Sequence, residues 1–233
     1  MSRPFKLYRL QQIDSQLDAM HIRLKEVEKA LNDNRAVVEV EQKLASVSEA
    51  LQRAKNSLRN AEHDTQQQRI KIEQTEATLY GGKVRNPKEL QDLQSESAAL
   101  KRHLSVLEER QFEAMLSEEE LSANYDCVAE EKAQILLDQD HRNRQLGLER
   151  EKLINDITRT EHERNAGITS IEPEDLQIYN QLRDKRRGIA VSKVVDRACS
   201  ACGSTLSAVL LNSAHSPNQL SFCETCGRIL YIG

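Results

Sequence analysis

The stretch LQQIDSQLDAMHIRLKEVEKAL, residues 10–31, determines how this chain folds. Leucines recur every seven residues, and a second apolar residue follows three positions after each of the first three leucines. The two sets are Leu10, Leu17, Leu24 and Leu31, and Ile13, Met20 and Val27. This spacing is the a/d pattern of a coiled coil, in which a narrow apolar stripe packs against another helix. Residues 10–31 therefore predict a long paired helix rather than part of a globular core.

The apolar stripe continues through Val40 to Leu79 and predicts a first helix over residues 4–80. Between Leu31 and Val40 it advances by three, three and three residues, with Asn34 in a core position, which predicts a stammer that overwinds the coil. Polar residues then take core positions and predict a looser distal section. They are Thr65, Gln68 and Thr75.

A second helix is expected over residues 87–165. Gly81 and Gly82 end the first helix, and Asn86-Pro87-Lys88-Glu89 supplies an N-cap, a proline at the first helical position and a capping glutamate. Two arms of nearly equal length, joined by a tip at 81–86, fold back on each other more readily than they pair with other chains. Residues 1–165 thus predict an antiparallel coiled-coil hairpin.

The hairpin tip is a candidate partner-binding site for an acidic protein or a phosphate, because cations cluster there. The candidate residues are Lys83, Arg85, Asn86 and Lys88. Heptads by themselves specify packing and no ligand, so a plain spacer or a homodimerisation arm is an equally weighted interpretation.

The C-terminal part changes character after residue 165. Residues 166–188 form a linker with a short helix expected over 175–187, and residues 189–195 are rich in β-branched side chains and predict a strand. Two cysteine pairs of the form C-x-x-C-G follow, and together they predict one tetrahedral Zn²⁺ site. The ligands are Cys199, Cys202, Cys223 and Cys226. The expected fold class is mainly α, with a small β zinc ribbon over residues 189–233.

Other chemistry for the cysteine pairs remains open from the spacing alone. A rubredoxin-like iron site uses similar turns, whereas a redox dithiol would need a βαβ surround that the sequence lacks. Four thiolates close the coordination shell, so the ion is expected to be structural and the protein not to be an enzyme. Cys127 is interpreted as a packing residue, and His215, in the loop between the pairs, as solvated.

Composition and charge restrict the function classes. Aromatic residues make up 3% of the chain, Trp is absent and charged residues make up 30%, which disfavours a large enclosed active site. No signal peptide or membrane span is apparent, and paired cysteines fit a reducing compartment, so a cytoplasmic protein is expected. The net charge of −4 divides into +4 for residues 182–233 and −8 for the remainder.

The basic end module is a candidate surface for RNA or DNA, with cations on phosphates and Phe222 or Tyr231 stacked on a base. The candidate cations are Arg183, Lys185, Arg186, Arg187, Lys193, Arg197 and Arg228. The equally weighted alternative is a protein-binding scaffold, in which the acidic hairpin presents its tip or flank and the ribbon is a docking head.

The chain resembles the bacterial family of C4-type zinc-ribbon proteins with an N-terminal coiled-coil hairpin. The resemblance depends on the tip YGGKVRNPKEL, residues 80–90, and on the terminal CETCGRILY, residues 223–231. It implies a binding protein or adaptor, in a family some of whose members are linked to RNA, to sigma factor 54 and to flagellar or type III secretion components.

Overall fold

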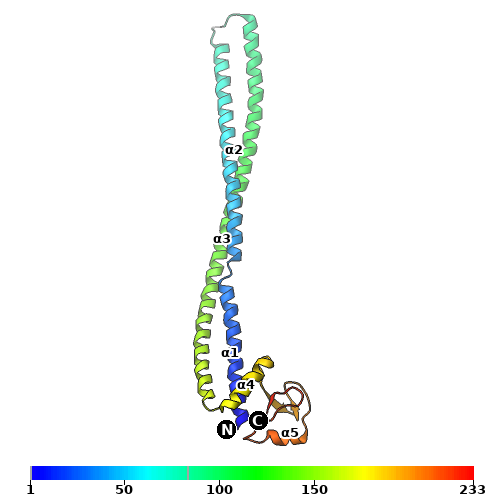
Figure 1. Ribbon diagram of the computed structural model, residues 1–233. Helices are drawn as coiled ribbons and strands as arrows, with labels where there is room; N and C mark the ends of the chain where they lie inside the picture. Colours follow the sequence, from blue (N-terminus) through cyan, green and yellow to red (C-terminus); the bar gives the residue numbers. More distant parts are fainter. Residues whose placement is uncertain (1, 83) are drawn as a thin grey trace. The chain divides into compact units, whose positions relative to one another are not determined.

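The computed structural model describes residues 2–82 and 84–233 (Figure 1). Its helices are α1 (Arg3–Leu31), α2 (Arg35–Tyr80), α3 (Pro87–Ile168), α4 (Pro173–Lys185) and α5 (Ala208–Ala214), and its strands are β1 (Val191–Val195), β2 (Ala198–Cys199) and β3 (Ile229–Tyr231). The expected fold class, a mainly helical hairpin followed by a small sheet, is confirmed. No helix among the described residues is long and apolar enough to cross a bilayer.

The first arm consists of two helices, so the prediction of one helix over 4–80 is wrong. α1 ends at Leu31 and α2 begins at Arg35, with Asn32, Asp33 and Asn34 between them. Short polar side chains of this kind bond to nearby backbone and compete with helical hydrogen bonds. The Asn32 side chain donates to the Glu28 carbonyl at 3.0 Å. The irregular spacing that predicted an overwound coil is therefore accommodated by a break.

The chain divides into two compact units, the first made of residues 1–33 with 142–233 and the second of residues 34–141. In the second unit, α2 packs antiparallel to the first part of α3 along an apolar seam. The buried apolar residues of this seam are Val40, Leu51, Ala54, Ile72, Leu79, Leu107 and Val128. Exposed ion pairs such as Lys43–Glu131 flank the seam, but pairs of this kind contribute only about 0–1 kcal/mol each. Burial of the seam is therefore the main source of stability.

The polar part of this seam is hydrogen-bonded. Thr65 and Gln68 are buried, and their side chains reach the carbonyls of Ala61 at 2.8 Å and Leu100 at 2.9 Å. A buried polar group is costly only when it lacks a partner. The looser packing expected in this section stays a prediction.

In the first unit, α1 supports both α4 and the ribbon sheet. The sheet order is β2-β1-β3, with β1 antiparallel to β2 and parallel to β3. The main apolar cluster joins α1, α4, β1 and β3 through Leu7, Leu10, Tyr179, Ala190, Val191 and Ile229. α4 begins and ends two residues earlier than the helix expected over 175–187. The ribbon thus shares one apolar core with the base of the hairpin and is not joined to it by residues 166–188 alone.

Two buried polar side chains of α1, those of Gln11 and Asp14, connect this helix to its neighbours. The Gln11 side chain donates to the Val191 carbonyl at 2.8 Å and accepts from the Val191 N–H at 2.6 Å. The Asp14 carboxylate, only 1% exposed, accepts from the Tyr179 hydroxyl at 2.7 Å and from Arg164 Nε at 2.5 Å. Burial, followed by the hydrogen bond to Asp14, raises the pKa of Tyr179 far above its usual value. These contacts orient α1, α3, α4 and β1 within one unit.

Candidate metal centre

The four cysteines lie in two turns of the same design. The Gly203 N–H donates to the Cys199 carbonyl at 2.8 Å, and the Gly227 N–H donates to the Cys223 carbonyl at 2.8 Å. Gly203 and Gly227 have φ values of +77° and +70°, a conformation that an L side chain rarely adopts. Glycine therefore lets each turn close so that its two sulfurs point to one side.

The sulfur positions fit a tetrahedral ion. All four Sγ atoms lie within 4.8 Å of one another. The Cys199–Cys226 and Cys202–Cys223 Sγ pairs are 3.8 Å and 3.7 Å apart. A tetrahedron with Zn–S bonds of about 2.3 Å has edges of about 3.8 Å, so these distances agree with zinc coordination.

The electrostatics of the cluster also fit a cation. Cys202 is exposed, and its hydrogen bond with Ser204 lowers the pKa of its thiol to about 6. Cys223 is buried, and burial raises its pKa to about 11. A buried thiolate needs compensating positive charge, which a bound Zn²⁺ supplies. The donor set of four thiolates therefore forms a single zinc site, as predicted.

Ser192 is a supporting residue that was not predicted from the sequence. Its hydroxyl is buried 3.1 Å from Cys199 Sγ and accepts from the Ala201 N–H at 3.1 Å. It thereby braces the first cysteine turn against β1. A serine inside a β-branched strand has no distinctive spacing, so no sequence signal marks this role.

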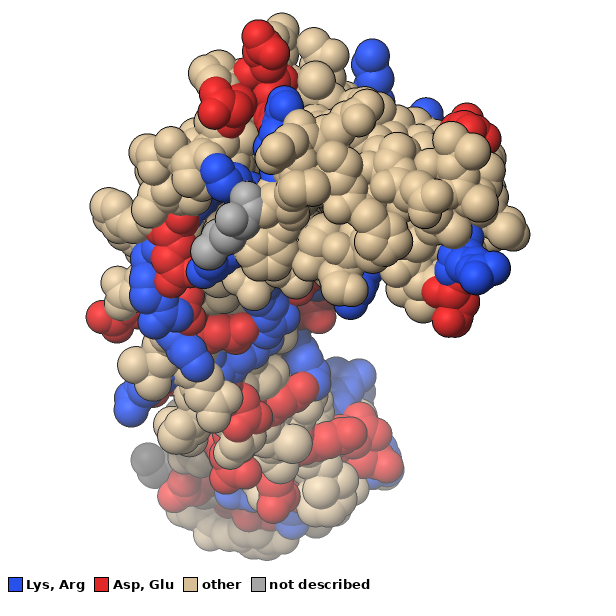
Figure 2. Space-filling model, turned by 90° about the horizontal axis from the view of Figure 1, so that it is seen from below, with Lys and Arg blue, Asp and Glu red and all other residues tan. Residues whose placement is uncertain are grey.

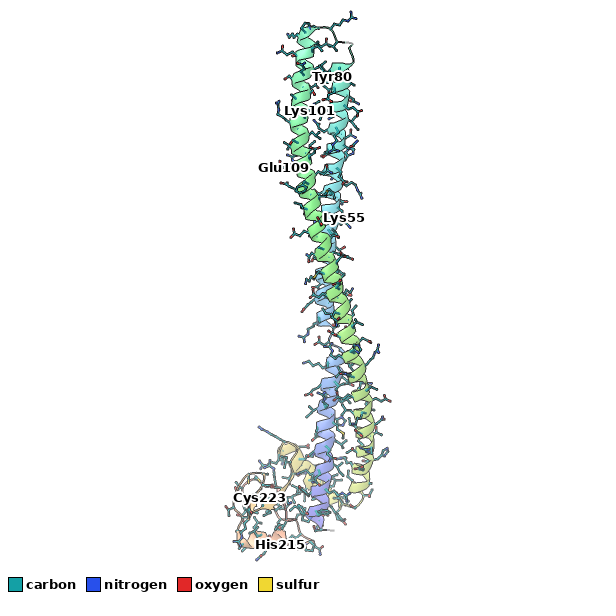
Figure 3. All side chains as sticks on the ribbon, turned by 180° about the vertical axis from the view of Figure 1, so that it is seen from behind. Lys55, Tyr80, Lys101, Glu109, His215 and Cys223 are labelled. Carbon is teal, nitrogen blue, oxygen red and sulfur yellow. The ribbon has the colours of Figure 1, made fainter. Side chains whose placement is uncertain are left out.

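Two other candidate residues, His215 and Cys127, lie outside the cysteine cluster. His215 caps α5, and its ring Nδ1 lies 2.8 Å from the Leu211 carbonyl. Figure 3 shows it at the outer edge of the ribbon, apart from Cys223. Cys127 is exposed on α3, so its interpretation as a packing residue is wrong. The neighbouring Val128 occupies the seam instead, with 1% exposure.

Of the cations predicted to bind nucleic acid, two make contacts within the chain and the others are exposed. Arg183 forms an ion pair with Asp18 at 2.5 Å, and Arg228 Nε donates to the Ile189 carbonyl at 2.8 Å. Exposed side chains make up the rest of the set, which is Lys185, Arg186, Arg187, Lys193 and Arg197. Tyr231 stacks on Tyr8 with ring centroids 4.8 Å apart, so one of its faces is already covered. Phe222 is 40% exposed.

At the tip, the structure describes three of the four candidate residues, and Lys83 lies outside the described residues. Arg85, Asn86 and Lys88 are exposed. The Asn86 Oδ1 accepts from the Lys88 N–H at 3.1 Å, which is the helix-capping contact expected at the start of α3. Asn86 thus has a structural role, while Arg85 and Lys88 stay candidates for partner contact.

An antiparallel coiled-coil hairpin with a four-cysteine ribbon defines the class of this protein. Residues 10–187 match the family model of the CT398-like coiled-coil hairpin domain, and residues 198–230 match that of the C4-type zinc ribbon domain. The chain belongs to the CT398-like coiled-coil hairpin family. No protein of curated function gives a significant match to it.

Solved structures share the fold at low sequence identity. CT398 from Chlamydia trachomatis is 18% identical with a TM-score of 0.76, covering 99% of this chain and 98% of its own. A protein from Mycobacterium smegmatis is 20% identical with a TM-score of 0.78, covering 100% of both chains. HP0958 from Helicobacter pylori is 16% identical with a TM-score of 0.50, covering 97% of this chain and 95% of its own. At these identities the likeness supports the fold alone.

Proposed function

We propose that this chain is a non-enzymatic zinc-ribbon adaptor that binds a protein partner through an uncharged surface of its ribbon. The observation that carries the proposal is the composition of residues 198–223, which contain no Lys, Arg, Asp or Glu in a chain where 30% of residues are charged. A surface built from such a segment attracts phosphates weakly. It can be desolvated at low cost, as the centre of a protein interface must be.

The exposure of this segment supports the same function. Val209 on α5 is 80% exposed and Phe222 is 40% exposed. In Figure 2 the ribbon occupies the right-hand part of the view. Its surface there is mainly free of charged side chains, with a few at the margin. Exposed apolar side chains within an uncharged surface and a charged margin are typical of interaction sites in soluble proteins.

The remaining parts fit the role of an adaptor. Four thiolates leave no open position on zinc for an activated water, so the ion stabilises the ribbon. The acidic hairpin supplies a long arm, and Arg85 and Lys88 at its tip offer a second contact. Cysteines that hold a metal ion instead of forming disulfides fit a reducing compartment, so we place the adaptor in the cytoplasm.

Affinity capture from native cells tests this function with the full-length, zinc-loaded protein. A partner that survives nuclease treatment and is lost with Val209→Asp would support the proposal. Val38→Asp is the matched control, because Val38 is 40% exposed on α2 and lies outside the ribbon. Capture that disappears on nuclease treatment, or that Val209→Asp leaves unchanged, would contradict it.

Nucleic-acid binding is the second candidate function, favoured by the exposed run Lys185-Arg186-Arg187 at the end of α4. If these cations contact phosphates, affinity for RNA should fall steeply with salt. The logarithm of the binding constant should fall with the logarithm of the salt concentration, with a slope of about −0.7 per phosphate contacted on a single strand. Reversing the charge of all three should reduce that slope. Weak binding that does not respond to salt would leave protein binding as the function.

A further inference from the structure

A half-open pocket of about 560 Å³ lies at the base of the hairpin, between the first turns of α1 and the last turns of α3. Both walls belong to the first compact unit. Its apolar side is formed by Phe5, Leu10 and Ile13 of α1. Leu10 and Ile13 are the first pair of the heptad stripe, so they occupy positions that normally pack against a facing helix. Leu10 is only 2% exposed and packs in the main apolar cluster, whereas Phe5 and Ile13 are half-buried. The pocket therefore exposes part of the apolar surface of Phe5 and Ile13.

The facing wall carries small residues, namely Ala166 and Gly167 at the end of α3 and Ser170 in the turn that follows it. A Cβ added at Gly167 would meet nothing within 4 Å, and its φ lies outside the positive range. Glycine in a helix costs about 0.5–1 kcal/mol relative to alanine. Neither close packing against the described residues nor backbone conformation therefore accounts for the glycine. Its effect is to keep the wall open.

The rim of the pocket is cationic on the α1 side. Lys6 Nζ donates to the Ser170 carbonyl at 2.5 Å and retains further N–H donors. Arg9 is exposed and forms no ion pair within residues 2–82 and 84–233. Glu163 on α3 is the acidic lining residue, so the lining carries a net charge of +1. An anionic group beside an apolar one would complement this arrangement.

We propose that this pocket is a docking site for a peptide segment of a protein partner, one that places a large apolar side chain next to a carboxylate. The proposal rests on the proposed protein-binding function and adds a further contact surface with its own chemistry. The volume lies in the range of about 300–1,000 Å³ found for ligand sites. The open mouth suits a side chain that enters from a peptide backbone. The apolar group would cover Phe5 and Ile13, and the carboxylate would face Lys6 and Arg9.

Four fluorescein-labelled peptides of equal length test this chemistry on the full-length, zinc-loaded chain. Each places either Phe or Ser at its centre, flanked by either Glu or Lys. By fluorescence anisotropy, the Phe/Glu peptide should bind about tenfold more tightly than each of the other three, a difference equivalent to one strong complementary contact. Equal binding of the four peptides, or binding of none, would overturn the inference.

Variants of the pocket separate docking from damage to the fold. Gly167→Leu should fill the pocket and weaken the Phe/Glu peptide about tenfold, whereas Gly167→Ala adds only a Cβ into open space and should retain binding. Arg9→Glu changes the net lining charge from +1 to −1 and should shift preference toward the Phe/Lys peptide. An unfolded variant could not show that gain. Binding unaffected by Gly167→Leu would contradict the assigned pocket.

Two further measurements distinguish a peptide from a fatty acid, and the pocket from the uncharged surface of the ribbon. Dodecanoate has the same combination of an apolar chain and a carboxylate, so it should compete only weakly if the occupant is a peptide. Tighter binding of dodecanoate than of every peptide would overturn the peptide assignment. Val209→Asp should leave peptide affinity unchanged. If it abolishes capture of a partner while no peptide binds the pocket, the pocket inference fails and the proposed adaptor function stands.

Discussion

At the scale of single residues, Asp14 of α1 connects α3 and α4 at the base of the hairpin. Its carboxylate is buried and receives hydrogen bonds from Tyr179 and Arg164, which come from different helices. A paired charge of this kind adds little net stability when complete. Removing one member is costly, because it leaves buried polar groups without partners.

Asp14→Ala should therefore destabilise the first unit by about 2–4 kcal/mol, since it leaves the fully buried Tyr179 hydroxyl without its acceptor. The measurement is the unfolding temperature by differential scanning calorimetry. Asp18→Ala is the control, because the Asp18 side chain is 52% exposed and pairs with Arg183 at the surface. It should cost less than about 1 kcal/mol. Equal losses of stability in the two variants would contradict the structural role assigned to Asp14.

At the scale of elements, the join between α1 and β1 determines where the ribbon sits in its unit. The carboxamide of Gln11 bonds both backbone groups of Val191, as a neighbouring strand would. On its other side, Val191 pairs in register with Ile229 of β3. A helix side chain thus completes the edge of the ribbon sheet.

Gln11→Ala should leave the Val191 N–H and carbonyl unpaired and cost about 1–3 kcal/mol. Hydrogen exchange at β1 and β3 should rise because the ribbon is held less firmly on α1. Gln12→Ala is the matched control, since Gln12 is exposed on the same helix. Unchanged exchange in Gln11→Ala would mean that the apolar cluster alone holds the ribbon.

The elements also mark what can be predicted from the sequence. The hairpin and the zinc turns follow from local spacing, because heptads and cysteine pairs repeat over short distances. The break at residues 32–34 was missed because the apolar stripe resumes beyond it. The join of α1 to the ribbon was missed because Gln11 meets Val191 across 180 positions of sequence, and one polar residue in a stripe has no period. The pocket beside Gly167 was missed because its two walls come from the start of α1 and the end of α3, which are far apart in the sequence.

At the scale of the whole molecule, the metal and the hairpin base are linked through one unit. The cysteine cluster packs with Leu206, Ala214 and Leu230, and the adjoining Ile229 packs with Leu7 and Leu10 of α1. A ribbon of this size depends on its metal for folding. Loss of zinc should therefore affect the first turns of α1 as well as the ribbon.

Acidification should release the metal, because zinc binds thiolates and protons compete for them. Burial raises the pKa of Cys223, which favours its protonated form over the thiolate that zinc needs. Zinc release on lowering the pH, followed with a colorimetric chelator, should be accompanied by loss of ribbon structure, while most helical circular dichroism remains. Unfolding of the ribbon at a pH where zinc is still bound would contradict this prediction.

The dependence of the hairpin base on zinc is best measured by hydrogen exchange with mass spectrometry on the full chain, with zinc bound and after its removal by a chelator. We expect one zinc per chain. Its removal should abolish protection over residues 190–231 and lower it in α1 near Leu7 and Leu10, with α2 unchanged. A ribbon that keeps its protection without metal, or that loses it with no effect on α1, would contradict a zinc-dependent ribbon built onto the base of the hairpin.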